Sequence, residues 1–404
     1  MSVSAVVPTL GRSPLLVPCL EALRRDGGSG LEIVVVDQGD LPADLPASLA
    51  DRVIRPGRNL GFAGGTNLGI AAAGGRLIAT VNDDVLVEPG WTAALAGALE
   101  ADPRAAAAQG VNLLLDEPGR ADGCGIAWNR WWQAVQVGHG KAAPSPEEGA
   151  REIFGVSATA ALYRREALAG PHPRPLSRLP PPDPRERGDK HPHPNSFSTR
   201  EEETRCHPEG EPCEREGSGR AELSTRPDPL GRRGSPQDDI GEPLASTGPD
   251  AGLAGLPSPG DGAGGAGRGA GGEGPFDPRL ISYYEDVELA GRLRAAGWHA
   301  LLVPAARARH AGSATGRTMS MERWRLIYGN RWLAAARLLG RGFWPRLPRI
   351  VLRDLLDLGR AAATGDGART AGIVTGWGRA LGGLPAWAHS GAPVVPPGEI
   401  ARFR

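Results

Sequence analysis

Polar side chains follow three predicted strands of the sequence. They are Pro8 and Thr9 after the first strand, Asp37 after the second, and Asn82, Asp83 and Asp84 after a third. Ligands of open α/β sheets bind outside the carboxyl ends of the strands, so we expect these groups to meet at one edge of a sheet. A carboxylate such as Asp37 can accept hydrogen bonds from a base N–H or a ribose hydroxyl. The alternative for each acidic group is a polar turn that ends a strand.

The pair Glu285 and Asp286 opens a predicted helix. A helix N-terminus stabilises the charged form of a carboxyl group, which suits a general base that must be deprotonated at neutral pH. Charge decoration of a helix end is the alternative. His310 stands alone after a later strand, and a lone histidine is more often structural than a ligand.

The run from Asn59 to Gly65, NLGFAGG, is rich in glycine and precedes Asn67. Glycine is used where the chain passes close to a ligand or adopts a positive φ, and a plain turn is the alternative. No Gly-Lys-Ser/Thr follows, so the run is not a P-loop.

The elements that must position these groups alternate between strands and helices. Strands are predicted at 4–8, 31–37, 52–55, 76–84, 105–113, 154–163 and 299–303, and helices at 13–25, 66–73, 91–101, 164–169, 285–296, 321–339 and 347–360. The run LEIVVVD is rich in β-branched residues, as is typical of strands covered on both faces. The alternation predicts an α/β fold with a doubly wound sheet.

Composition excludes several classes of protein. The 404 residues carry 46 Lys and Arg against 46 Asp and Glu, and a zero net charge argues against a nucleic-acid binder held by a positive field. Four Cys are too few for a disulfide scaffold and fit a reducing compartment, which favours a cytoplasmic location. The N-terminus does not resemble a signal peptide, and no apolar run has the length of a membrane-spanning helix.

An excess of glycine and proline is concentrated in residues 171–274, which contain no Val, Met, Trp or Tyr. Such a segment buries too little apolar surface to offset its ordering entropy, so we expect a long disordered insertion. It is either a regulatory or partner-binding arm, or an insertion tolerated in a surface loop.

Five blocks in order resemble the inverting family 2 glycosyltransferases of the GT-A fold. They are VVPTLGR, VVVDQGD, NLGFAGGTNLGI, VNDDVLVEPGW and YYEDVELAGRLRAAGWHALLVPAARARHAG. The resemblance extends from residue 3 to about residue 330 without the insertion, and is closest to the rhamnosyltransferase-like branch. It implies a Rossmann-like mixed sheet flanked by helices. Residues 1–170 would form the nucleotide-sugar-binding part, 275–320 the acceptor and catalytic part, and 321–404 a C-terminal helical extension.

The resemblance also assigns roles to residues. Donor-binding residues would be Pro8, Thr9, Asp37, Asn59, Gly61, Gly64, Asn67 and Asp83. Asp84 matches the last Asp of the family's Asp-x-Asp metal motif, Asn82 replaces the first, and His310 would complete a site for Mg²⁺ or Mn²⁺. Asp286 would be the general base, and Glu285 either its alternative or a group that positions the acceptor.

Three further features each have two interpretations. Trp128, Trp131 and Trp132 are either a platform for an acceptor sugar or core residues at a sheet edge. The basic amphipathic stretch 347–360 either lies on an anionic membrane surface, as a lipid-linked acceptor would favour, or packs on the domain. Arg307, Arg309 and Arg317 are cations that either help to hold a diphosphate or decorate the surface.

The resemblance implies transfer of a sugar from a nucleotide-diphosphate donor to a glycan or lipid-linked acceptor, in cell-surface polysaccharide biosynthesis at the inner face of the cell membrane. It suggests dTDP-rhamnose, while UDP- and GDP-sugars, the acceptor and the oligomeric state stay open. One alternative is a nucleotidyltransferase, which would need a glycine-rich loop after the first strand. Another is a nucleotide-sugar-binding protein that the insertion has disabled.

Overall fold

The first half of the sheet is parallel. The computed structural model describes residues 2–169, 274–312, 319–388 and 395–403. Strands β1 (Val3–Thr9), β2 (Leu31–Asp37), β3 (Arg52–Ile54) and β4 (Leu77–Val81) lie in the order β4-β1-β2-β3. Thr9 is paired with Asp37, so the carboxyl ends of β1 and β2 lie level with each other.

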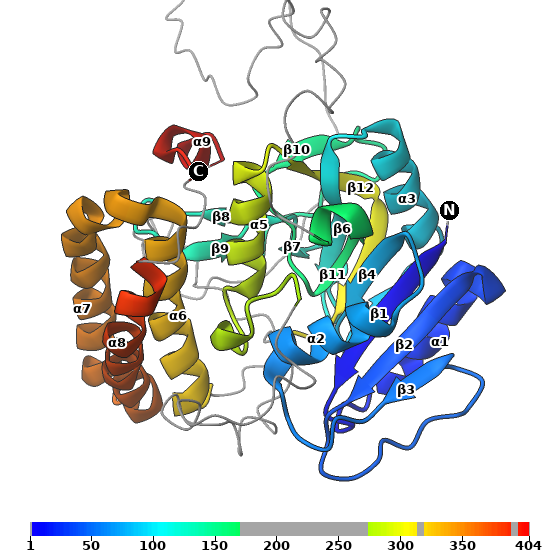
Figure 1. The fold of residues 1–404 in the computed structure, drawn as a ribbon, viewed down its shortest axis with the longest axis horizontal. Coiled ribbons are helices and arrows are strands. Elements are labelled where there is room, and N and C mark those ends of the chain that lie inside the picture. Colours follow the sequence, from blue (N-terminus) through cyan, green and yellow to red (C-terminus); the bar gives the residue numbers. More distant parts are fainter. Residues whose placement is uncertain (1, 170–273, 313–318, 389–394, 404) are drawn as a thin grey trace, which may run out of the picture. The chain divides into compact units, whose positions relative to one another are not determined.

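The second half makes the sheet mixed. β11 (Ala160–Arg164) is antiparallel to both β4 and β6 (Ala105–Leu114), and β12 (His299–His310) runs parallel to β6. The short strands β5 (Val85–Val87), β7 (Ala121–Gly123) and β10 (Arg151–Ile153) pair with β12, β6 and β12. Figure 1 shows β12 beside β6, and in the order β10-β12-β6-β11-β4-β1-β2-β3 only the short strand β10 lies beyond β12. The predicted mixed α/β sheet is confirmed.

Helices cover both faces of this sheet. On one face α1 (Leu16–Gly27) and α3 (Trp91–Ala101) pack on a core that includes Val7, Ile33 and Ala79. On the other face α2 (Gly61–Ala72) and α5 (Glu285–Ala295) pack on a core that includes Val6 and Val34. The strand residues alternate between the two cores because side chains of a strand alternate between its faces. A short helix, α4 (Arg165–Leu168), follows β11.

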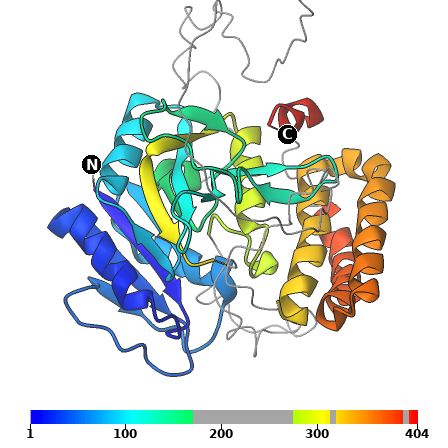
Figure 2. The same ribbon diagram turned by 180° about the vertical axis from the view of Figure 1, so that it is seen from behind.

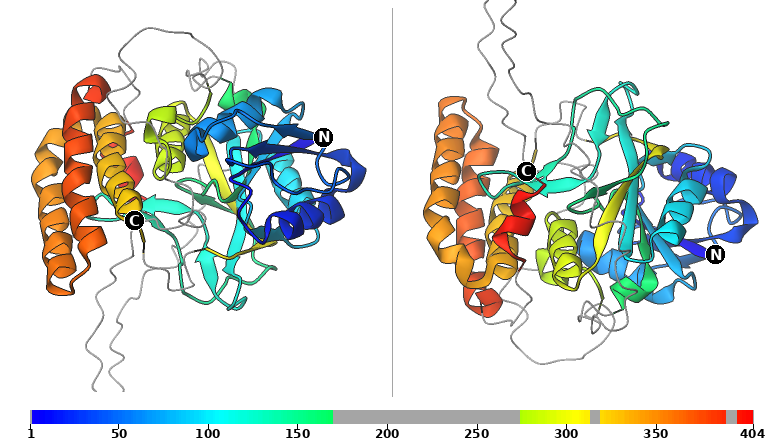
Figure 3. Two further views of the ribbon diagram at one scale, coloured as in Figure 1. Left: turned by 90° about the horizontal axis from the view of Figure 1, so that it is seen from below. Right: turned by 90° about the horizontal axis from the view of Figure 1, so that it is seen from above.

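A third core joins a hairpin to the C-terminal helices. The hairpin is β8 (Ile126–Trp128) and β9 (Ala134–Gln136), and the helices are α6 (Met321–Leu339), α7 (Leu347–Ala363), α8 (Gly367–Ala388) and α9 (Pro397–Ala401). Seen from behind in Figure 2 and from below and above in Figure 3, α6, α7 and α8 run side by side. The apolar face of α5 reaches both this core and the sheet, so α5 joins the two parts.

Most predicted elements are confirmed, with four differences. The strand predicted at 154–163 is wrong over its first half, since β11 covers only Ala160–Arg164. The glycine run does not form a loop before a helix, since α2 already begins at Gly61. The strand predicted to end at residue 303 continues to His310, because a register shift between Leu302 and Arg307 accommodates Pro304. Within the predicted helical extension 321–404, the sequence predicts no separate helix after residue 360, where α8 forms.

The predicted disordered insertion, residues 171–274, lies outside the described residues except for Gly274. The division of the chain into functional parts stays a prediction. No helix in the described ranges is both long enough and apolar enough to cross a membrane.

Candidate active site

The ends of β1 and β4 are joined by side chains. Thr9 donates its hydroxyl to Asp83 Oδ2 at 2.5 Å, and its Oγ1 accepts the backbone N–H of Gly11 at 2.9 Å. Burial raises the pKa of Asp83 to about 7, and the neighbouring charge of Asp84 acts in the same direction. The predicted meeting of the strand ends is thus observed for these two strands.

Asp84 and His310 face each other in the buried interior. His310 Nε2 lies 3.3 Å from Asp84 Oδ1, and on its other side His310 Nδ1 lies 2.8 Å from Asp122 Oδ2. Burial alone would lower the pKa of His310, but the carboxylates of Asp84 and Asp122 outweigh it and raise that pKa well above its usual range. Asp122 fixes the ring so that Nε2 points at Asp84.

Among the described residues, Asn82 Oδ1, Asp84 Oδ1 and His310 Nε2 are buried and meet no hydrogen-bond partner, and the last two face each other only as an ion pair at 3.3 Å. Buried polar atoms are normally paired, so such a group indicates a missing ligand. Two ligands at about 2.1 Å from one octahedral ion and at right angles to each other lie about 3 Å apart, which the 3.3 Å between Asp84 and His310 approaches. A carboxylate, an imidazole and an amide oxygen therefore fit a hard divalent cation.

The protein supplies few ligands for a cation at this place. Within the described ranges, no three His, Cys, Asp or Glu side chains form a group that could hold a metal ion. A cation held by Asp84 and His310 would need further oxygen ligands, which Mg²⁺ characteristically takes from water and substrate phosphates.

Asp286 lies in the first turn of α5 and faces the sheet. Its Oδ1 accepts the N–H of Val287 at 2.7 Å, and its Oδ2 accepts the N–H of Ala158 at 3.4 Å. Burial raises the pKa of Asp286 to about 6 against the opposing effect of these donors. Burial and the charge of Asp286 raise the pKa of Glu285 well above its usual range, and Glu285 Oε2 has no partner. Both pKa values are raised, that of Glu285 the more strongly, so the two carboxyl groups titrate as a coupled pair.

The segment 157–159 connects the two halves of the site. The carbonyl of Thr159 accepts the N–H of Asn82 at 2.8 Å, while Ala158 donates to Asp286. Gln109 bridges Ser157 and Gly123, since its Oε1 accepts the Ser157 N–H at 2.6 Å and its Nε2 donates to the Gly123 carbonyl at 3.3 Å. Gly123 follows Asp122, which contacts His310. Residues 82–84, the pair of His310 and Asp122, and Asp286 are therefore connected by hydrogen bonds through residues 157–159.

The turn before α5 has an unusual backbone. Ile281, Tyr283 and Tyr284 have φ values of 66°, 68° and 71°, a region that costs non-glycine residues roughly 1–3 kcal/mol each. Asn330 of α6 opposes this cost, because its Nδ2 lies 2.7, 2.8 and 2.9 Å from the carbonyls of Leu280, Ser282 and Tyr283. The strained turn that presents Glu285 and Asp286 is thus held from the helical extension.

More side chains support the same turn. Arg379 of α8 donates to Asn330 Oδ1 at 3.0 Å and fixes the orientation of its amide. Arg323 of α6 bonds the hydroxyl of Tyr283. The Tyr284 hydroxyl accepts the N–H of Ala134 at 3.3 Å, and its ring lies 5.8 Å from that of Trp128.

Asp37 is committed to its own loop. Its carboxylate accepts the N–H groups of Gly39 at 3.1 Å and Ala43 at 2.9 Å, and pairs with Arg55 at 3.1 Å. These bonds are those of a polar turn that ends a strand, the alternative interpretation of Asp37. A donor-binding role for Asp37 stays a prediction. The neighbouring Gln38 accepts the N–H of Leu60 at 2.9 Å, which links this loop to the start of α2.

The glycines of α2 allow close packing. Gly61, the first residue of α2, has a φ of 74°. Its backbone N–H donates to Asn59 Oδ1 at 2.8 Å, which closes a turn at the start of the helix. A Cβ at Gly64 would lie 2.8 Å from the Leu60 side chain, and one at Gly65 would lie 2.3 Å from Gln38. Their small size is needed whether or not a donor lies against them.

Asn67 braces the chain where it returns to the domain. It donates to the Phe276 carbonyl at 2.7 Å and accepts the Phe276 N–H at 3.1 Å. The structure therefore gives Asn67 a supporting contact, and its predicted donor contact is untested.

Two of the three tryptophans follow the packing interpretation, whereas Trp131 is half-buried with the Arg349 guanidinium 5.3 Å from the centre of its ring. Trp128 and Trp132 are buried in the core with Tyr284 and α6, so they do not form a platform for an acceptor. Arg307 and Arg309 alternate with His310 along β12 and point to the opposite face, where Arg309 pairs with Glu88 at 2.9 Å. Arg317 lies outside the described residues.

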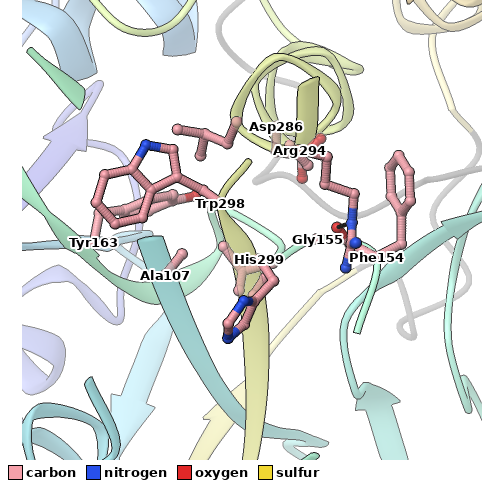
Figure 4. Close-up of a pocket in the computed structure, with 12 residues that line it drawn as sticks. Ala107, Phe154, Gly155, Tyr163, Asp286, Arg294, Trp298 and His299 are labelled. Atoms are coloured by element: carbon pink, nitrogen blue, oxygen red, sulfur yellow. Dashed lines mark hydrogen bonds between the residues drawn. The ribbon is translucent and has the colours of Figure 1, made fainter. Parts of the chain in front are cut away.

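A cavity lies behind Asp286, between α5 and the sheet. It has a volume of about 10 Å³, and its lining includes Gly155, Tyr163, Asp286, Arg294 and Trp298. Figure 4 shows Asp286 and Arg294 entering from α5 and Tyr163 and Trp298 from the sheet side. The volume is about that of one water, so the cavity leaves room for hydration of Asp286 but not for a sugar.

Several site residues were not predicted. Asp122, Asn330 and the network of Gln109 and Ser157 are single polar residues in apolar or loop sequence, with no spacing that relates them to His310 or Asp286. The ADG tripeptide around Asp122 looks like a turn, and only the pairing of β7 with β6 places it behind His310.

Part of this chain is similar in sequence to a known protein family. The family model described as "Glycosyl transferase family 2" matches residues 4–169. No curated protein matches the chain.

Three solved structures are similar in fold at low identity. GalNAc-T7 with UDP, GalNAc and Mn²⁺ has 12% identity and a TM-score of 0.47, over 85% of this chain and 49% of that one. TarS of S. aureus has 12% identity and a TM-score of 0.40, over 87% and 43%. The mannosyltransferase PcManGT from Pyrobaculum calidifontis, in complex with GDP-Man and Mn²⁺, has 14% identity and a TM-score of 0.38, over 96% and 83%. The chain spans about half the length of the first of them.

The region that matches the family model contains Thr9, Asp83 and Asp84, and ends shortly before the undescribed residues. The similarity to the glycosyltransferase family 2 model therefore covers residues 4–169, about two fifths of the chain.

Proposed function

We propose that this chain transfers a sugar from a nucleotide-diphosphate donor to an acceptor hydroxyl, with inversion at the anomeric carbon. The observation that carries the proposal is the group of unpartnered buried atoms on Asn82, Asp84 and His310, in one hydrogen-bonded cluster with Asp286. A cation site and a base connected through three backbone residues are what such a displacement requires.

The donor diphosphate would lie at the carboxyl ends of β1 and β4. Asp84 Oδ1, His310 Nε2 and the amide oxygen of Asn82 would hold Mg²⁺ or Mn²⁺. Bound there, the cation would offset the negative charge of the diphosphate leaving group. Asp122 keeps the imidazole oriented for this task. Thr9 holds Asp83 beside the cation site.

Asp286 would act as the base. Its carboxylate takes the proton of the acceptor hydroxyl while that oxygen bonds the anomeric carbon, and the bond from that carbon to the diphosphate oxygen breaks. The nucleoside diphosphate leaves with the bonding electrons, and no covalent enzyme intermediate forms. With a pKa of about 6, Asp286 is ionised at neutral pH and still basic enough to accept a proton.

The finer assignment follows the resemblance of the sequence. A dTDP-rhamnose donor, a glycan or lipid-linked acceptor, and a place in cell-surface polysaccharide biosynthesis at the cytoplasmic side of the membrane are proposed together. UDP- and GDP-sugars are the alternatives for the donor.

The first test is binding and turnover with a panel of dTDP-, UDP- and GDP-sugars, with Mg²⁺, Mn²⁺ or a chelator. We expect one nucleotide to bind in the presence of the cation and to be released as the diphosphate. Asp286→Asn should bind the donor normally and lose about 10²–10⁴-fold in transfer rate. Asp84→Asn should lose cation-dependent binding, measured by calorimetry without any turnover.

The exposed Asp44 supplies the matched control, and Asp44→Asn should change neither quantity. Full transfer by Asp286→Asn would remove Asp286 from the role of base. Donor binding without turnover by the wild type would instead favour a non-catalytic binding protein.

A further inference from the structure

Helix α7 has two different sides. One side is buried and includes Ile350, Asp354 and Asp357. On the opposite side Leu352, Leu355 and Leu356 are 49%, 50% and 47% exposed. At 100° per residue these three leucines fall within an arc of about 100°, so they form a continuous stripe along the helix.

Further large apolar side chains are exposed on the elements that neighbour α7. Trp344, in the turn before α7, is 55% exposed, and on α8 Val374 and Leu381 are 51% and 61% exposed. α8 packs against α7, as Figures 1 and 3 show. We call the stripe of Leu352, Leu355 and Leu356 together with Trp344 the leucine face.

The charges around the leucine face have one sign. The exposed charged side chains of residues 340–384 are Arg341, Arg349 and Arg360. The acidic side chains of the same stretch are directed elsewhere, since Asp354 and Asp357 are buried and pair with Arg331 and Arg353. Asp366 is half-buried in the turn after α7, where it caps the N–H of Arg369 at 2.9 Å.

The buried carboxylate of Asp354 holds α7 to its neighbouring helices. Asp354 accepts the indole N–H groups of Trp332 at 2.8 Å and Trp377 at 3.0 Å, which binds α7 to α6 and α8. The carboxylates of α7 thus serve the helical core, and the outer side of the helix is left with leucines and arginines.

We infer that the leucine face binds the surface of a bilayer that contains anionic phospholipids. Leucines would enter the boundary between headgroups and acyl chains, Trp344 would lie at the headgroup level, and the three arginines would contact lipid phosphates. The exposed charges of residues 340–384 are all cations, which makes this face complementary to an anionic surface. None of the described helices is able to span a membrane, so the contact is peripheral. The inference concerns a surface apart from the proposed active site and stands independently of the proposed transfer.

The test is cosedimentation of the full chain with vesicles of phosphatidylcholine alone and of an equal mixture of phosphatidylcholine and phosphatidylglycerol. We expect binding to the mixed vesicles that weakens as salt is raised. The triple variant Leu352→Gln/Leu355→Gln/Leu356→Gln should bind them at least about tenfold more weakly. All three leucines are exposed, so the variant is expected to fold, which circular dichroism and the unfolding temperature check.

Two control variants make the result specific. Leu41→Gln alters a leucine that is 79% exposed in a loop far along the sequence, and should bind the mixed vesicles like the wild type. Arg341→Gln/Arg360→Gln should weaken binding about tenfold or more on the mixed vesicles. Arg25→Gln/Arg76→Gln removes the same charge from other exposed positions and should have little effect.

Absence of wild-type binding to mixed vesicles would overturn the inference, as would equal losses in the leucine variant and in Leu41→Gln. A dimer of the wild type that the triple leucine variant converts to monomer, seen by analytical ultracentrifugation, would show that the face is an interface between two copies instead. Donor binding is measured on each variant and should be unchanged, so failure here is separate from failure of the proposed function.

Discussion

Asn330 and Tyr283 are joined by a hydrogen bond of 2.9 Å from the side-chain amide of Asn330 to the carbonyl of Tyr283, whose φ is 68°. The bond connects α6 of the helical extension to the turn that precedes the proposed base. The helices beyond residue 320 are therefore part of the machinery that shapes the site.

Removing this support should impair chemistry more than binding. Asn330→Ala leaves three carbonyls without their donor, and we expect the strained turn to relax and Asp286 to move. The expected result is a fall in kcat of about 10–100-fold, with KM for the donor within about twofold and a loss of about 1–3 kcal/mol in stability. Steady-state kinetics well below the unfolding temperature measure the split.

Ile350→Ala is the control for general destabilisation. It opens a cavity in the core of the helical extension at a cost of about 2–5 kcal/mol and leaves the hydrogen bond from Asn330 to Tyr283 in place. Its kcat should match the wild type. An equal fall of kcat in both variants would mean that Asn330 acts through stability alone.

The pH dependence of transfer should show one acidic limb. Because Asp286 has a pKa of about 6 and must be deprotonated to act, kcat/KM should rise with pH and reach half its plateau near pH 6. Glu285 is expected to be protonated in this range, so Glu285→Gln should keep the limb within about half a pH unit. A limb that disappears in Glu285→Gln, with activity retained in Asp286→Asn, would exchange the two roles.

The same carboxylate should reduce stability at neutral pH. Its pKa rises from 3.8 in the unfolded chain to about 6 in the folded protein, so its favourable contribution is present below pH 3.8 and is lost as the pH rises through 6. Asp286→Asn should therefore be more stable than the wild type by up to about 3 kcal/mol at pH 7.5, and by much less at pH 4. Urea unfolding at the two pH values measures the difference; a wild type that is the more stable protein at pH 7.5 would contradict it.

Asp122 should matter for the cation although it would not contact it. Asp122→Asn removes the charge that orients His310, and we expect cation-dependent binding of the nucleotide diphosphate to weaken about 10–100-fold. Binding measured with a chelator should change little. A similar loss with and without the cation would assign Asp122 to the nucleotide or to folding.

Much of the fold was predictable because the strands carry clear patterns. The run Leu31–Asp37 is uniformly apolar and β-branched, and the structure has β2 at those residues. Trp91–Ala101 and Met321–Leu339 likewise match α3 and α6. The glycine run was misassigned because glycine normally weakens a helix, whereas here its small size allows α2 to approach Gln38 and Val6.

The site was only partly predictable. Residues at strand ends and helix starts, such as Asp84 and Asp286, stand at positions that local pattern identifies. Asp122 and Asn330 take their roles from strand pairing and helix packing over long separations, at 188 residues from His310 and 47 from Tyr283. No local pattern encodes such contacts.

The contacts of Phe276 bear on whether the chain can be divided into two polypeptides. Its ring lies 6.2 Å from those of Phe62 and Tyr163, and Asn67 holds its backbone, so the second part of the chain has its own anchor on the first. Leu168, at the end of the first part, lies in the same core. Two separately made polypeptides, one ending at residue 169 and one starting at residue 274, should therefore assemble into a working pair without a covalent link.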